Sequence, residues 1–284
     1  MTIERSKRSS GRWAVLALAL LAVSACSGGS PITESSGGGV AWVEMPTKSD
    51  GTLRAAFAKP AGPGPHPGAI FGHGTGVRVH GHEKAVAQGE TDVRAFARAL
   101  ADAGFVAVAP LRTANSNTAS VVRGQFTGSA QLWEDTIDFG RRSVLEARRW
   151  LMARPEVDAK RIVVVGFSEG GNATLWALGD EPQIAAAVLM SPASIDHGPK
   201  RSLRAAAQSE VLLRVKTPIL VTAGTDDNQA ILGSLRRALL PALEGAGATV
   251  TAKLEYPGSH GSFYAIRQDF WDDIVAFLKR HTAP

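Results

Sequence analysis

The chain has 284 residues, 44% of them hydrophobic, which is enough for one large folded domain. Much of its formal net charge of +5 comes from four basic residues near the N-terminus, Arg5, Lys7, Arg8 and Arg12, which face one acidic residue. Beyond residue 25, 27 basic residues face 25 acidic ones, an excess too small for a polyanion-binding surface, so we expect no nucleic-acid partner.

The first residues have the pattern of a secretory signal peptide. A basic start is followed by an apolar run over residues 13–23, which is short for a membrane-spanning helix. The run ends in Val23-Ser24-Ala25-Cys26, which resembles a bacterial lipobox, and Cys26 is the chain's single cysteine. Since one cysteine cannot form an internal disulfide, we expect Cys26 to carry a lipid that anchors an exported protein to a membrane of the cell envelope. An ordinary signal peptide with an unmodified cysteine is the alternative.

The remaining sequence predicts a tether and one folded domain. Residues 26–39 are rich in serine and glycine and have little to bury, whereas residues 40–284 alternate apolar strand patterns with helical periodicity. The predicted strands are 40–44, 53–59, 68–71, 105–109, 161–165, 184–190, 217–222 and 249–255. The predicted helices are 83–103, 132–152, 173–178, 230–243 and 263–279. This order predicts an α/β fold with a mostly parallel eight-stranded sheet, helices on both faces and an antiparallel hairpin at one edge.

One stretch organises the chemistry of this domain. Gly166-Phe167-Ser168-Glu169-Gly170 lies between a buried strand and a helix, which is the context of a nucleophile elbow. In such an elbow Ser168 stands at the tip of a strained turn with positive φ, and the glycines avoid collisions with neighbouring backbone. A serine hydroxyl also needs a base, and the base needs an acid to orient it.

The order of residues along the chain narrows the choice of base and acid. In elbow hydrolases the acid and then the histidine follow the serine, each on a loop after a later strand. His260 follows the last predicted strand in a glycine-flanked loop. Asp226 and Asp227 follow the strand 217–222, and either could be the acid; Asp227 is preferred because it lies three residues after Gly224.

A tetrahedral intermediate needs two backbone NH donors. We expect one from Glu169, directly after the serine, and one from the glycine-rich loop at residues 72–76, where Thr75 is preferred and Gly74 is the neighbour. The Glu169 side chain is expected to face the mouth of the site and to disfavour anionic substrates. His80, His82 and Glu83, with His73 nearby, could suggest a metal site, but no predicted strand or helix fixes their spacing, so no metal is predicted.

These motifs together resemble the α/β-hydrolase superfamily, and within it the dienelactone-hydrolase-like branch. The resemblance rests on G-F-S-E-G-G, G-T-D-D, Y-P-G-S-H-G and G-H-G-T-G, and it extends from about residue 40 to the end. Dienelactone hydrolases proper have a cysteine nucleophile, whereas residue 168 is serine. The resemblance therefore implies a serine hydrolase of carboxylic esters that needs no metal or organic cofactor and acts on a small-molecule ester. A peptidase or an acyltransferase would use the same residues, and a non-catalytic, surface-anchored binding protein is the alternative of another class.

Overall fold

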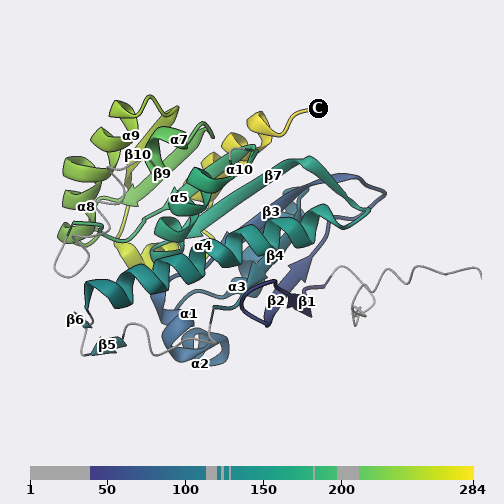
Figure 1. The fold of residues 1–284 in the computed structure, drawn as a ribbon, viewed down its shortest axis with the longest axis horizontal. Coiled ribbons are helices and arrows are strands. Elements are labelled where there is room, and N and C mark those ends of the chain that lie inside the picture. The colour runs from purple at the N-terminus through teal and green to yellow at the C-terminus, as the bar shows by residue number, and fades with distance from the viewer. Residues whose placement is uncertain (1–38, 113–119, 123–124, 128, 182, 197–210) are drawn as a thin grey trace, which may run out of the picture.

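The computed structural model describes residues 39–112, 120–122, 125–127, 129–181, 183–196 and 211–284. Its main sheet has the strand order β1-β2-β4-β3-β7-β8-β9-β10 (Figure 1). The strands are β1 Ala41–Pro46, β2 Thr52–Ala58, β3 His66–Gly72, β4 Val106–Pro110, β7 Val157–Phe167, β8 Ala186–Met190, β9 Ile219–Gly224 and β10 Val250–Tyr256. β2 pairs antiparallel with β1 and β4, and the other neighbours are parallel. This confirms the predicted eight-stranded, mostly parallel sheet with an antiparallel edge.

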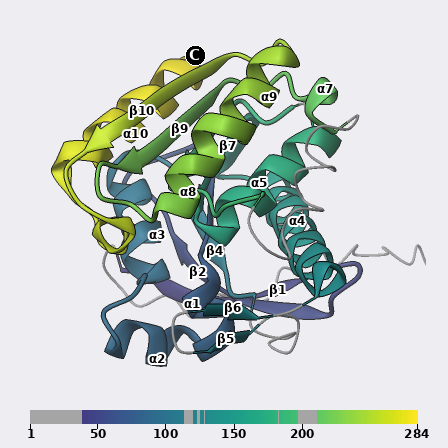
Figure 2. The ribbon, with the colours of Figure 1, turned by 90° about the vertical axis from the view of Figure 1, so that its left-hand side faces the viewer.

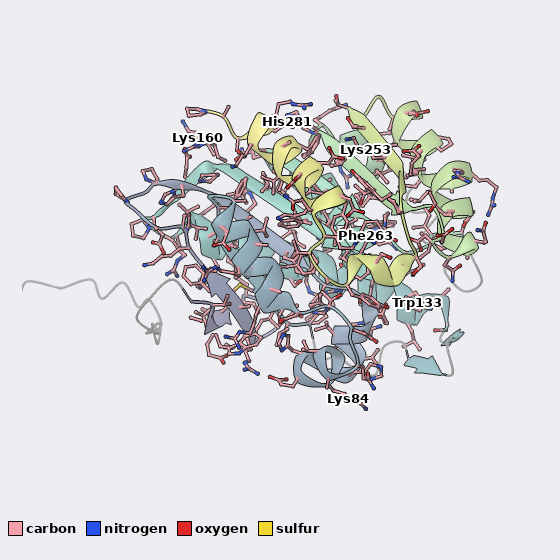
Figure 3. The ribbon with its side chains drawn as sticks, turned by 180° about the vertical axis from the view of Figure 1, so that it is seen from behind. Lys84, Trp133, Lys160, Lys253, Phe263 and His281 are labelled. Atoms are coloured by element: carbon pink, nitrogen blue, oxygen red, sulfur yellow. The ribbon has the colours of Figure 1, made fainter. Side chains whose placement is uncertain are left out.

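Helices cover both faces of the sheet. They are α1 Thr75–His80, α2 His82–Ala87, α3 Val93–Asp102, α4 Ala130–Met152, α5 Glu169–Asp180, α7 Leu212–Arg214, α8 Gln229–Ser234, α9 Leu240–Gly245 and α10 Gln268–His281. Helices α4, α5, α8 and α9 pack in one apolar core, and α3 and α10 pack in the other (Figure 2). Seen from behind, α3 and α10 lie across the second face, with Phe263 next to α10 (Figure 3).

Strand β7 shows why the sequence of the central strands is continuously apolar. Residues 162–167 are all buried. Ile162 and Val164 belong to the first core, while Val163 and Val165 belong to the second. Because successive side chains of a strand point to opposite faces, a strand covered on both sides needs apolar residues at every position. The same strand ends at Phe167, directly before Ser168, so the packed centre of the sheet supports the elbow.

The structure corrects two expectations about the region after β3. The predicted helix 83–103 is wrong as a single element, because it is divided into α2 and α3. Gly89 has φ 76° in the break, and the Asp92 side chain accepts a hydrogen bond from Arg94 N to begin α3. The predicted glycine-rich loop also contains a helix, since α1 begins at Thr75. Helices α1 and α2 lie at the same end of the molecule as the two short paired strands β5 Ser120–Val122 and β6 Gln125–Thr127 (Figures 1 and 2).

Three further elements differ from their predicted form. The segment 112–129, for which no period was found, includes the short strands β5 Ser120–Val122 and β6 Gln125–Thr127. The predicted helix 230–243 contains a π-helical turn, η3 Leu235–Leu239, which ends two residues before Pro241, a residue with no NH to continue an α-helical ladder. The predicted helix 263–279 begins later than expected, because Phe263 ends a 3₁₀ turn, η4 His260–Phe263, and α10 begins only at Gln268.

The predicted signal peptide, Cys26 and all but the last residue of the predicted tether fall at residues 1–38, outside the described residues. Within the part of the chain that the structure describes, no helix combines the length and the apolar character needed to cross a membrane.

Candidate active site

The turn between β7 and α5 has the geometry of a nucleophile elbow. Ser168 has φ 55° and ψ −117°, in the region of positive φ that residues other than glycine rarely adopt. A Cβ on Gly166 would overlap the carbonyl oxygen of Gly170, and a Cβ on Gly170 would overlap that of Gly72. The two flanking glycines are therefore required for the turn to pack against its own helix and against the end of β3.

His260 lies opposite the serine. Its Nε2 is 3.0 Å from Ser168 Oγ, within hydrogen-bond distance. The histidine begins the η4 turn after β10, and its ring packs on Phe167 with the ring centroids 4.9 Å apart. The His260 side chain keeps 22% of its surface exposed. This geometry allows the imidazole to take the hydroxyl proton and later to release it.

Asp227, and not Asp226, contacts this histidine. Asp227 Oδ1 is 3.2 Å from His260 Nδ1 and also accepts a hydrogen bond from Asn228 N at 2.7 Å, and the carboxylate is fully buried. Asp226 is exposed, and its backbone NH bonds to the Gly258 carbonyl. Asn228 caps the helix that follows. The structure thus brings together the three residues that the sequence proposed as a triad.

A fourth polar residue, Ser191, lies at this junction and was missed in the sequence. Its hydroxyl is 2.7 Å from His260 Nδ1 and donates a hydrogen bond to Asp227 Oδ2. Ser191 directly follows β8 and is fully buried. The available signal was its position, since polar residues at the carboxyl ends of parallel strands collect at one edge of the sheet.

The expected oxyanion donors also lie beside the serine. Gly74 approaches the elbow so closely that a Cβ on it would lie 3.2 Å from Ser168 Cβ. Thr75 is the first residue of α1, and Glu169 is the first residue of α5. NH groups in the first turn of a helix have no carbonyl partner four residues earlier, so both are available to a ligand.

The Glu169 side chain does not face the mouth of the site, and that expectation is wrong. The side chain is 1% exposed and lies between two buried arginines. Arg78 Nε and Nη2 each donate to it at 2.9 Å, Arg112 Nη1 donates at 3.0 Å, and Thr75 Oγ1 donates at 2.9 Å. Burial alone would raise the pKa of Glu169, but the positive charges of Arg78 and Arg112 outweigh it and lower the pKa to about 2.

His73 completes this buried network in its neutral form. Its Nδ1 is 2.9 Å from the Gly74 carbonyl, and its Nε2 accepts a hydrogen bond from Arg112 N at 3.0 Å. One ring nitrogen therefore donates and the other accepts, which defines the neutral tautomer with a proton on Nδ1. Burial, reinforced by the charge of Arg112, lowers the pKa of His73 well below its ordinary value.

The histidine that follows α1 contacts an aspartate and a tryptophan. His82 Nε2 is 3.0 Å from Asp92 Oδ1, and the His82 ring packs edge-on against Trp42. In the described ranges, no three His, Cys, Asp or Glu side chains are grouped as a metal site would require. Arg78 and Arg112 were also missed as site residues, because a lone arginine carries no local signal of an ion pair with a residue far along the chain.

Comparison with known proteins gives the family. The sequence profile of the dienelactone hydrolase family matches residues 54–279. A search among curated proteins finds no match. Three similar solved structures show the fold.

A protein from Klebsiella pneumoniae subsp. pneumoniae, provisionally named a dienelactone hydrolase, has 20% identity and a TM-score of 0.61, and the match covers 85% of this chain and 98% of that one. Acetyl xylan esterase 1 from Thermoanaerobacterium sp. has 17% identity and a TM-score of 0.56, covering 89% and 88%. The acylaminoacyl peptidase of Pyrococcus horikoshii has 19% identity and a TM-score of 0.59, covering 86% of this chain and 42% of that one. The chain therefore has the α/β-hydrolase fold and belongs to the dienelactone hydrolase family of hydrolases.

Proposed function

We propose that the chain is a serine esterase that cleaves small carboxylic esters through an acyl-enzyme on Ser168. The observation that carries the proposal is the continuous set of contacts from Ser168 Oγ to His260 Nε2, and from His260 Nδ1 to Asp227 Oδ1, at 3.0 and 3.2 Å. This is the arrangement in which a weakly nucleophilic hydroxyl becomes reactive at neutral pH.

The first half of the reaction forms the acyl-enzyme. His260 Nε2 takes the Ser168 proton while Oγ attacks the ester carbonyl carbon. The negative charge that develops on the carbonyl oxygen is held by the backbone NH groups of Glu169 and Thr75 or Gly74. The intermediate collapses when the bond to the leaving alcohol breaks, and His260 gives its proton to the departing oxygen.

The second half releases the acid. A water molecule gives a proton to His260 Nε2 and attacks the acyl carbon, and the bond to Ser168 Oγ then breaks as Oγ recovers the proton. Asp227 remains ionised throughout and orients the ring through Nδ1. Neither half calls for a metal or an organic cofactor.

The test is a series of p-nitrophenyl esters with increasing acyl length, given to the native chain and to Ser168→Ala. We expect turnover that is lost in the variant, and covalent labelling by a fluorophosphonate at Ser168. Hydrolysis of peptide anilides but not esters would indicate a peptidase, and product partitioning toward an added alcohol would indicate an acyltransferase. The absence of labelling and of turnover would favour the non-catalytic binding protein.

We also propose that the protein is exported and lipid-anchored through Cys26. The support is the order of basic residues, apolar run and small residues before the single cysteine. Expression of the full chain and of Cys26→Ala in a bacterial host tests it. The native chain should partition into the detergent phase and the membrane fraction, and the variant should be found in neither. Equal partitioning of the two proteins would contradict the proposal.

A further inference from the structure

Ser191 has a backbone conformation that normally belongs to glycine. Its φ of 42° makes it, with Ser168, one of two non-glycine residues with positive φ among the described residues. Such a conformation is strained for a residue with a side chain and persists only where the surroundings hold it. A glycine would relieve the strain, so the retained side chain at this position needs an explanation.

The backbone around Ser191 is tied to the nucleophile. Ser168 N donates to the Met190 carbonyl at 3.0 Å, and Ala193 N donates to the Ser168 carbonyl at 2.9 Å. Ser191 N itself donates to the Thr222 carbonyl of β9 at 2.8 Å. The residues on both sides of Ser191 therefore hold the elbow, and its own NH holds the strand that leads to Asp227.

The hydroxyl fits between the base and the acid in only one proton arrangement. An ionised carboxylate only accepts hydrogen bonds, so the single Ser191 proton goes to Asp227 Oδ2. The oxygen of Ser191 is then left to accept, and the group 2.7 Å away is His260 Nδ1, which must carry the proton. Nε2 is consequently the unprotonated nitrogen that faces Ser168. Asp227 Oδ1 shares the same Nδ1 proton at the longer distance of 3.2 Å.

We propose that Ser191 is a positioning residue that holds His260 in the tautomer and orientation needed for general-base catalysis, sharing this task with Asp227. The inference rests on the proposed function of Ser168 and His260. Its distinctive feature is that one buried loop residue connects the two parts of the site. The backbone next to Ser191 fixes the serine, and its hydroxyl fixes the acid–base pair.

Two substitutions separate the hydroxyl from the backbone. Ser191→Gly removes the hydroxyl and relieves the positive φ, whereas Ser191→Ala removes the hydroxyl and keeps the strain. Ser194→Ala is the matched control, because its hydroxyl is buried in the same loop but contacts Asp196, at 3.4 Å, instead of the triad. If the Ser191 hydroxyl had no role in the site, Ser191→Gly, which relieves the positive φ, should be at least as stable and as active as the native chain.

We expect both Ser191 variants to lose about 10- to 100-fold in kcat with KM within about twofold, which corresponds to one hydrogen bond to a charged group. Fluorophosphonate labelling should slow in parallel, and Ser194→Ala should leave both rates unchanged. Full kcat in Ser191→Gly would overturn the proposal, even if the variant were more stable.

A spectroscopic readout keeps the inference distinct from the esterase proposal. The His260 Nδ1 proton should give a low-field proton resonance, identified by its loss in His260→Ala. It should move in Ser191→Gly and stay in place in Ser194→Ala. If the native chain cleaves no ester but the resonance moves, the esterase proposal fails and the contact between Ser191 and the imidazole stands. If the resonance is unmoved in Ser191→Gly, the positioning role is overturned whatever the activity.

Discussion

The two sides of the candidate site are built from different chemistry. On the acid–base side, Asp227, His260 and Ser191 are joined by hydrogen bonds, and the imidazole is 22% exposed. On the oxyanion side, Glu169 and two arginines form an ion network whose side chains are at most 1% exposed. In the proposed reaction the first side exchanges protons with substrate and water, so it needs contact with solvent. The second side would only have to stay in place while charge develops, so it can be sealed.

The hydrogen bonds around Glu169 compensate for the cost of burying this ion network. Desolvating three charges is unfavourable unless geometry and hydrogen bonding compensate for it. Here Glu169 receives hydrogen bonds from Arg78, Arg112 and Thr75. Two of the residues proposed as oxyanion donors, Thr75 and Glu169, are thereby joined through their side chains, and Glu169 with its two arginines carries one net positive charge.

The acid–base side should depend on Asp227 and not on its neighbour. We expect Asp227→Asn to reduce kcat by about 10³- to 10⁴-fold, because an amide disturbs the imidazole tautomer. Asp226→Asn is the matched control, since Asp226 is exposed, and it should change kcat by less than about twofold. Parallel ester kinetics on the two variants measure the difference. Similar losses in both would contradict the assignment of Asp227.

The oxyanion side should contribute most to stability. Glu169→Ala leaves two buried guanidinium groups without their carboxylate, and we expect it to lower the free energy of unfolding by about 3–5 kcal/mol. Urea denaturation measures this. Glu83→Ala is the control, because Glu83 pairs with Arg54 at the surface, where the Glu83 side chain is 69% exposed and the Arg54 side chain 42%. This substitution should lower the free energy of unfolding by at most about 1 kcal/mol. Equal costs for the two variants would show that burial of the network is unimportant.

The same network predicts how stability depends on pH. The pKa of Glu169 falls from an ordinary 4.5 to about 2 in the folded chain, so its contribution is complete above pH 4.5 and is lost as the pH falls toward 2. The full loss is about 3 kcal/mol. Unfolding free energies measured between pH 6 and pH 2.5 should decline in the native chain. Glu169→Gln should lack that part of the decline, and identical slopes would contradict the assigned cause.

Local pattern was enough for the sheet and for the elbow, but not for partners distant in the chain. The mostly apolar run from Arg161 to Val165 predicts a buried strand, and the glycines around Ser168 predict a tight turn. Both predictions need only residues that are neighbours in the sequence. The order of acid and histidine after the serine narrowed the choice to His260 and to the pair Asp226 and Asp227.

Other features depend on contacts between distant segments. Asp226 and Asp227 are adjacent, and only the turn after β9 decides which of them points inward. Ser191, Arg78 and Arg112 acquire their roles from residues 36 to 91 positions away. Gly89 is a signal for the break between α2 and α3, but the helical periodicity on both sides of it also fits one continuous helix. The orientation predicted for the Glu169 side chain was wrong for a similar reason. No residue beside Glu169 in the sequence indicates that two distant arginines are buried against it.

The smallest expected effect tests whether the oxyanion side positions a donor or only stabilises the fold. Thr75→Val keeps the side-chain shape and removes the hydroxyl that donates to Glu169 Oε2 at 2.9 Å. We expect kcat to fall about tenfold, equivalent to about 1.4 kcal/mol, with KM nearly unchanged. Thr75→Ser, which retains the hydroxyl, should keep most of the activity.

The affinity for a boronic acid, which forms a tetrahedral adduct on serine, should fall by the same factor as kcat/KM in Thr75→Val. If instead the variant loses stability but keeps both kcat and boronate affinity, the hydroxyl of Thr75 supports the fold and not the oxyanion. A parallel loss of kcat and boronate affinity, with rescue by serine, would place the effect in the transition state, because a fold-only role would leave the affinity for a tetrahedral adduct unchanged.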